Sequence, residues 1–118
     1  MLTELDLAGN GIDDAGAKAL ASALRVNAVL TTLNVGYNSL TEEAALSIVR
    51  VERQRNKLKS LGLGCCGIGP IGAVEIADYV SGSEVLKALF IGGNELGDEN
   101  AKAIRDAVSG REGFKLYM

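Results

Sequence analysis

Hydrophobic and polar positions repeat along the chain with a period of 28 residues. Three later stretches follow the pattern that LTELDLAGNGI sets at 2–12, namely LTTLNVGYNSL (30–40), LKSLGLGCCGI (58–68) and LKALFIGGNEL (86–96). Their opening residues are Leu2, Leu30, Leu58 and Leu86, and Phe114 stands where a fifth copy would begin. A fixed period of this length is typical of a solenoid, in which each repeat is one structural unit stacked on the next.

Each copy opens with a short alternation of apolar and polar residues. In the first copy Leu5 and Leu7 alternate with Glu4, Asp6 and Ala8, which is the period of a strand with one buried face. The equivalent apolar pairs are Leu33 and Val35, Leu61 and Leu63, and Leu89 and Ile91. We therefore predict four strands at these positions, with a fifth possible at 115–117.

An asparagine follows the strand in three of the four copies, at Asn10, Asn38 and Asn94. The chain must turn away from the sheet here, and a buried amide can pair both the donors and the acceptors that the backbone leaves free. The third copy has Cys66 instead. We expect this thiol to be buried and poorly reactive, and Cys65 to be the more accessible of the two, with a reactive Cys66 as the alternative.

The second half of each copy changes to helical periodicity. The apolar stripe of the first copy is Ala17, Leu20, Ala21 and Leu24, and the third copy repeats it at Ala73, Ile76, Ala77 and Val80. The predicted helices are 14–26, 42–55, 70–81 and 98–109. Their aligned first residues are Asp14, Glu42, Pro70 and Asp98, all suited to a helix N-terminus.

The second copy departs from the pattern near the end of its helix. Glu52 stands where Leu24 and Val80 stand in other copies, so this helix end is expected to be looser or longer. A basic run surrounds it at Arg50, Arg53, Arg55, Lys57 and Lys59. The run could contact an acidic protein or phosphates, but Glu52 interrupts it and no aromatic residue interleaves for base stacking. A solvated helix end is the simpler interpretation.

Stacked strand–turn–helix units must form a curved structure, because helices are about 10 Å wide and strands lie about 4.8 Å apart. We predict an α/β solenoid, a segment of a horseshoe, with a parallel sheet on the concave face and helices on the convex face. It forms a single domain over 1–118. The repeats start near 2, 30, 58 and 86, with a partial fifth from 114.

Composition argues against several classes of function. Hydrophobic residues make up 47% of the 118 and aromatic residues only 4%, so thin aliphatic layers must form the interior. The net charge of −3 disfavours a nucleic-acid binder that relies on overall charge. There is no histidine and no serine with a neighbouring base, which argues against an enzyme and against catalytic residues. We expect no cofactor and no metal.

The two cysteines are adjacent, which is the wrong spacing for a disulfide framework or a zinc site. Reduced thiols in a cytoplasmic protein are the expected state. No signal peptide pattern and no apolar run of about 18 residues is visible, so no membrane partner is expected.

Gly62, Gly64 and Gly67 match the GxGxxG pattern of dinucleotide-binding loops. The repeat explains them better, because Gly64 aligns with Gly36 and Gly67 aligns with Gly11. In addition, no acidic residue stands at the end of the next strand to bind a ribose. We therefore do not expect nucleotide binding.

The unit LxxLxLxxN followed by a full helix resembles the leucine-rich repeat, specifically the ribonuclease-inhibitor-like subtype, over essentially the whole chain. The resemblance implies the horseshoe fold, and the family commonly accepts cysteine at the asparagine position. Related proteins bind ribonucleases, activate Ran-type GTPases or sense ligands in immune receptors. None of their functional residues can be transferred to this sequence.

The leading hypothesis is a protein-interaction scaffold that binds a protein partner, of unknown identity, on the concave sheet. The outward strand residues there are Glu4, Asp6, Thr32, Asn34, Ser60, Gly62, Ala88 and Phe90, with Tyr37 at the rim. Phe90 is the expected anchor, since aromatic side chains dominate interface energetics. An inert face is the competing interpretation. The alternative function is a regulatory segment, GTPase-activating or ligand-sensing, of a longer repeat protein.

No capping element is recognisable at either end, so apolar side chains and strand edges are expected to be exposed. Phe114 and Tyr117 are predicted at buried repeat positions. We expect self-association as a homodimer through Phe114, Leu116, Tyr117 and Met118.

Overall fold

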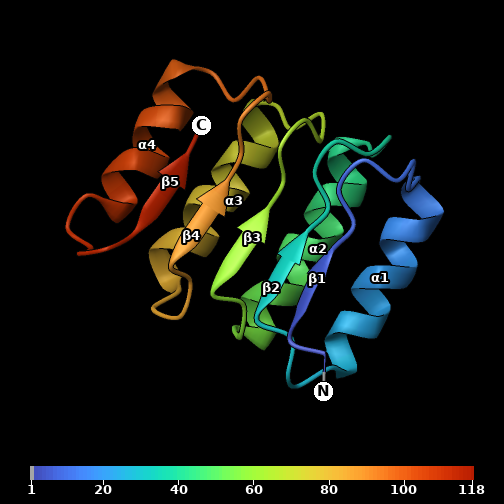
Figure 1. The fold of residues 1–118 in the computed structure, drawn as a ribbon. Coiled ribbons are helices and arrows are strands. Elements are labelled where there is room, and N and C mark those ends of the chain that lie inside the picture. Colours follow the sequence, from blue (N-terminus) through green and yellow to red (C-terminus); the bar gives the residue numbers. More distant parts are fainter. Residues whose placement is uncertain (1) are drawn as a thin grey trace.

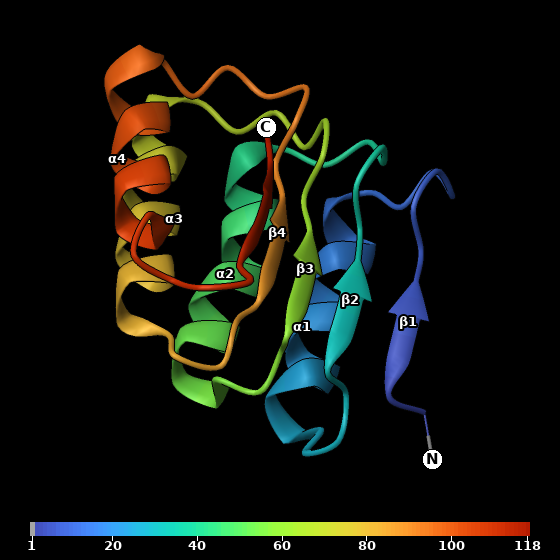
Figure 2. The ribbon, with the colours of Figure 1, turned by 60° about the vertical axis from the view of Figure 1, so that its left-hand side comes forward.

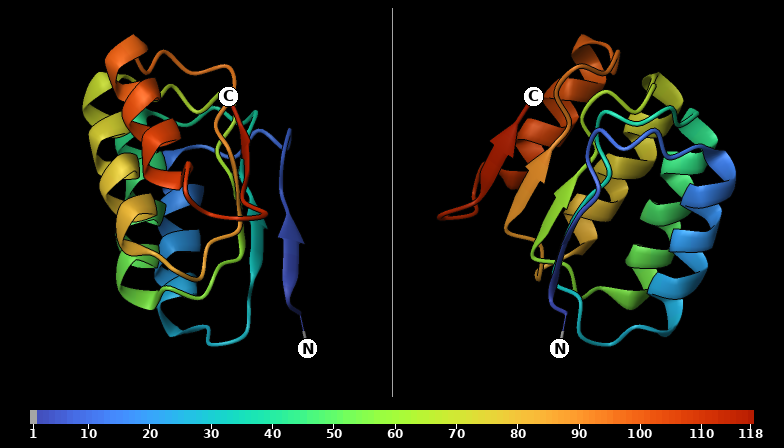
Figure 3. Two further views of the ribbon diagram at one scale, coloured as in Figure 1. Left: turned by 90° about the vertical axis from the view of Figure 1, so that its left-hand side faces the viewer. Right: turned by 45° about the vertical axis from the view of Figure 1, so that its right-hand side comes forward.

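Five short parallel strands lie side by side in chain order, and four helices cover one face of the sheet (Figure 1). The computed structural model describes residues 2–118. The strands are β1 (Glu4–Asp6), β2 (Thr32–Asn34), β3 (Ser60–Gly62), β4 (Ala88–Phe90) and β5 (Lys115–Tyr117). The helices are α1 (Asp14–Val26), α2 (Glu42–Arg55), α3 (Pro70–Gly82) and α4 (Asp98–Val108). Figures 2 and 3 show every helix on the same side of the sheet, which confirms the predicted solenoid.

The four helices begin at the predicted residues and end within one residue of the predicted ends. Local capping explains two of the starts. The side chains of Asp13 and Thr41 accept hydrogen bonds from the N–H groups of Gly16 and Ala44, so they cap α1 and α2.

The acidic residues at helix starts also link one repeat to the next. The Asp14 carboxylate accepts hydrogen bonds from the backbone N–H and the hydroxyl of Thr41, both at 2.9 Å, and these bonds lower the pKa of Asp14. Glu42 accepts from the N–H groups of Gly69 and Gly72 at 2.6 and 3.1 Å. Gly69 has no side chain with which to cap α3, so Glu42 of the preceding repeat supplies the cap.

The apolar strand residues form a ladder through the molecule. The residues at the centre of each strand pair in register, namely Leu5, Leu33, Leu61, Leu89 and Leu116. The three middle leucines are fully buried, and they belong to one core that also holds the inward faces of the helices.

The register of β5 corrects one prediction. A strict period of 28 would bury Tyr117, but Leu116 pairs with Leu89 and Tyr117 pairs with Phe90 on the outward face. The fourth repeat is one residue shorter than the others between helix start and strand start. A shift of one residue exchanges the two faces of a strand, so Leu116 points inward and Tyr117 outward.

The end of α2 confirms one of two predicted alternatives. α2 is one residue longer than α1, as expected, but it is not loose. Glu52 is fully buried and pairs with Arg55 at 2.9 Å, and its second oxygen accepts from the N–H groups of Lys57 and Leu58, both at 2.7 Å. The acidic residue therefore fixes the turn that leads into the next strand.

Candidate protein-binding face

The concave sheet face carries two rows of outward side chains, one from each end of the short strands. One row holds Glu4, Thr32, Ser60, Ala88 and Lys115, and the other holds Asp6, Asn34, Gly62, Phe90 and Tyr117. Neighbours within a row lie about 4.8 Å apart, the spacing of adjacent strands. This arrangement presents an ordered array of side chains on one face of the sheet.

Six of the predicted binding residues line one hollow of about 420 Å³ on this face. They are Glu4, Asp6, Thr32, Asn34, Ser60 and Phe90. Gly62 forms part of the lining, and a side chain at this position would collide with the Asn34 amide. The glycine therefore keeps the middle of the face open.

The face is acidic at one edge and aromatic at the other. Glu4 and Asp6 are exposed on β1, and Phe90 is 40% exposed on β4. The ring of Phe90 stacks on Tyr117 with centroids 4.6 Å apart and an interplanar angle of 1°. The pair holds both rings in one orientation, which lowers the entropy that Phe90 would lose on binding a partner.

Tyr117 is the outward residue that the sequence pattern missed. It is 51% exposed and extends the aromatic end of the face beyond Phe90. The alternation of Lys115, Leu116 and Tyr117 already permitted this orientation, because a strand with one apolar residue in the middle can bury that residue alone.

Tyr37 lies apart from the hollow. It follows β2 with a positive φ of 61° and is 66% exposed. A Cβ atom on Gly64 would lie 3.1 Å from its ring, so the ring rests over the turn of the next repeat. Tyr37 thus borders the concave face at the end of the strands, as its predicted rim position requires.

The two thiols lie as predicted. Cys66 is fully buried, and burial raises its pKa to about 11, whereas Cys65 is exposed. Within residues 2–118 no group of three or more Cys, Asp or Glu side chains is placed to hold a metal ion. None of the helices in the described part is long and apolar enough to cross a membrane.

The repeat geometry agrees with comparisons to known proteins. The family model described as Leucine Rich repeat matches residues 1–21, 26–49 and 55–77, together more than half of the chain. The chain belongs to the leucine-rich repeat family. The full helix in each of the four repeats is consistent with the ribonuclease-inhibitor-like subtype. No curated protein sequence matches the chain.

Solved structures of leucine-rich repeat proteins share the fold. The actin-binding site 2 of leiomodin-1 matches with a TM-score of 0.80 at 17% identity, over 98% of this chain and 69% of that one. The tropomodulin C-terminal domain from Caenorhabditis elegans matches with a TM-score of 0.75 at 20% identity, over 88% of this chain and 63% of that one. The leucine-rich repeat chain described here thus spans less than two thirds of the tropomodulin domain.

Proposed function

We propose that this leucine-rich repeat protein is a protein-interaction scaffold whose partner binds on the concave sheet face. The observation that carries the proposal is the hollow of about 420 Å³, with carboxylates at one edge and Phe90 at the other, where the Phe90 ring is held by stacking on Tyr117. Rigid aromatic side chains in a partly enclosed site are the usual anchors of protein interfaces. The acidic edge adds preference for a partner with a basic side chain.

Actin is the first protein to test, because the fold is shared with the actin-binding site 2 of leiomodin-1. Co-sedimentation with actin filaments tests this candidate. Affinity purification, followed by binding assays with each purified candidate, would identify another partner. Phe90→Ala should weaken the complex by roughly 2 kcal/mol if Phe90 is the anchor.

The matched control is Ile71→Ala on α3. Ile71 is 76% exposed and lies outside the hollow, so it tests whether loss of any exposed apolar side chain weakens binding. Equal affinities for wild type and Phe90→Ala would contradict binding on the concave face. Stimulated nucleotide hydrolysis by an added GTPase would instead favour the regulatory alternative, a GTPase-activating segment of a longer repeat protein.

Self-association is a second proposed activity, favoured by exposed apolar atoms on the outer strand of the sheet. Tyr117 and Met118 are 51% and 44% exposed, whereas Phe114 and Leu116 are half-buried against the core. A homodimer would pair the two β5 edges around a two-fold axis. Sedimentation across a concentration series tests this, and a dimer that is unaffected by Tyr117→Asp would exclude this interface.

We also propose a cytoplasmic location, which the two free thiols favour, since thiols stay reduced in that compartment. Microscopy of a fluorescent fusion would check it.

A further inference from the structure

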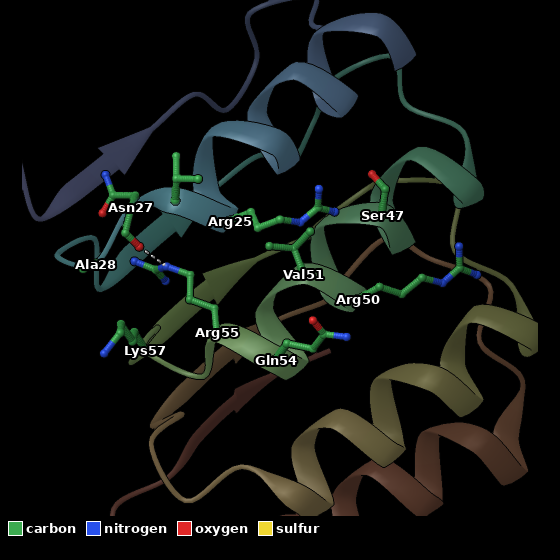
Figure 4. Close-up of a pocket in the computed structure, with 10 residues that line it drawn as sticks. Arg25, Asn27, Ala28, Ser47, Arg50, Val51, Gln54, Arg55 and Lys57 are labelled. Carbon is green, nitrogen blue, oxygen red and sulfur yellow. Dashed lines mark hydrogen bonds between the residues drawn. The ribbon is translucent and has the colours of Figure 1, made fainter.

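A second hollow lies on the opposite side of the molecule, where the C-terminal ends of α1 and α2 meet (Figure 4). Its volume is about 510 Å³, within the range of about 300–1,000 Å³ that ligand sites occupy. We name it the convex groove. Its lining is Arg25, Val26, Asn27, Ala28, Ser47, Arg50, Val51, Gln54, Arg55 and Lys57.

The convex groove is basic in an acidic protein. The chain carries a net charge of −3, yet the lining holds four cationic side chains and no carboxylate. Three of the four belong to the basic run around Glu52, and Arg25 joins them from the preceding repeat. Stacking therefore adds one cation of the first repeat to the three that the second repeat supplies.

Two of the cations are fixed in place by other groups. Arg55 is almost fully buried and donates to Glu52 and to the carbonyl oxygens of Asn27 and Leu30. Arg50 pairs with Glu75 through two hydrogen bonds of 3.0 and 2.9 Å and also with Glu43. These partners hold the two guanidinium groups in place, so Arg50 and Arg55 form part of the wall of the groove.

The other two cations are free to take a ligand. Arg25 and Lys57 are exposed, and neither forms an ion pair with any residue of the described part of the chain. Figure 4 shows Arg25 extending from the end of α1 toward α2. The apolar part of the groove consists of Val51, which is buried, and of the exposed residues Ala28 and Val26, the latter 85% exposed.

We propose that the convex groove binds an acidic segment of a partner protein, in which carboxylates lie next to an aliphatic side chain. Arg25 and Lys57 would pair with the carboxylates, and Val26 and Ala28 would contact the aliphatic group. Charge complementarity favours this occupant. A single-stranded nucleic acid is disfavoured, because the lining has no aromatic side chain on which a base could stack.

Fluorescence anisotropy with a labelled peptide of Glu, Asp and Leu residues tests the proposal on the intact chain. The double variant Arg25→Glu/Lys57→Glu should weaken binding by at least about tenfold. Binding should also weaken as salt concentration rises. The matched control Lys18→Glu/Arg105→Glu makes the same change in net charge at exposed positions outside the groove, and should bind as wild type does.

Three outcomes would overturn the proposal. The first is equal affinity of wild type and Arg25→Glu/Lys57→Glu for the acidic peptide. The second is equal affinity of wild type for the acidic peptide and for a peptide with Gln and Asn in place of the acids. The third is full competition by a short RNA or by inorganic phosphate at low concentration. Circular dichroism of each variant checks that the fold is intact. Phe90→Ala should bind the acidic peptide normally, which separates the convex groove from the concave face.

Discussion

Single side chains join the repeats where the chain turns away from the sheet. The Asn94 amide donates to the carbonyl oxygens of Leu63 and Ile91 at 2.9 and 3.0 Å, and its oxygen accepts from the N–H groups of Cys66 and Ile68 at 2.9 and 3.0 Å. Asn38 makes the equivalent bonds two repeats earlier. Each asparagine therefore pairs backbone groups of two repeats at once.

We expect Asn94→Ala to lower the free energy of unfolding by roughly 3 kcal/mol, because backbone groups of two repeats lose their partners. Urea denaturation measures the loss. Asn10→Ala is the matched control, since Asn10 is exposed and its side chain makes one bond, to Ala8 at 3.2 Å. This variant should lose less than about 1 kcal/mol. Equal losses would contradict the role assigned to the amide.

Cys66 takes the place of this asparagine in the third repeat. Its sulfur lies 3.5 Å from the carbonyl oxygen of Gly64 and 3.8 Å from that of Val35. The Val35 carbonyl is aligned with that of Leu7, to which the Asn38 amide donates. A thiol is only a weak donor, so the third repeat is joined less firmly to the second than the fourth is to the third.

Thiol labelling should distinguish the two cysteines. At pH 8 Cys65 should react readily, and Cys66 should react only after denaturation, because its pKa is raised to about 11 and its sulfur is buried. Mass spectrometry of labelled peptides identifies the modified residue. Faster modification of Cys66 would refute its burial. By the same reasoning Cys66→Asn should be tolerated, with a free energy of unfolding at least equal to that of wild type.

Helices are held at their C-terminal ends by arginines of the following repeat. Arg55 donates to the carbonyl oxygens of Asn27 and Leu30, and Arg111 donates to those of Val80 and Ser83. Val80 and Ser83 lie in the last turn and at the C-cap of α3, and Asn27 and Leu30 lie at the C-cap of α1 and shortly after it, where few N–H groups remain to pair with backbone carbonyls. Only Arg55 has a buried counter-ion, Glu52, so α2 is the helix whose end depends most on charge.

Glu52→Leu should destabilise the protein by about 3–5 kcal/mol, because Arg55 would stay buried without its partner. The double variant Glu52→Leu/Arg55→Met should recover part of this loss, since an aliphatic residue stands at the aligned positions Leu24 and Val80. Chemical denaturation of the single and double variants measures the coupling.

The control is Glu43→Gln, which removes an exposed partner of Arg50 and should cost less than about 1 kcal/mol. If Glu52→Leu were as mild as Glu43→Gln, the ion pair would have no structural role.

Across the whole molecule, each repeat gains its stability from its neighbours. Leu61 and Leu63 of the third repeat are fully buried, whereas Leu5 and Leu7 of the first are only half-buried. A stack of this kind has no single closed core, so its outer repeats should open before the inner ones.

Hydrogen exchange should follow this gradient. The N–H groups of Leu7 and Leu63 both donate across the sheet, at 2.8 and 2.7 Å, so a difference between them reports on local opening rather than on bond geometry. We expect Leu63 to exchange at least roughly tenfold more slowly than Leu7. Exchange at one uniform rate would instead indicate all-or-none unfolding of the whole stack.

The sequence by itself determined the repeat, the strands, the helix starts and the parallel order, because the period of 28 places equivalent residues of successive repeats side by side. It also determined which strand residues face outward in the first four repeats, since a strand alternates its two faces. Burial of Cys66 followed from the same alignment.

Tertiary structure decided the features that depend on contacts between repeats. Whether Leu116 or Tyr117 faces inward depends on how β5, which follows the shorter fourth repeat, pairs with β4. No local pattern distinguishes the two registers. Glu52 is buried because Arg55 and two backbone N–H groups converge on it. The convex groove exists because stacking brings Arg25 beside residues more than 20 positions later in the chain. The packing of α1 against α2 decides how close these residues lie in space.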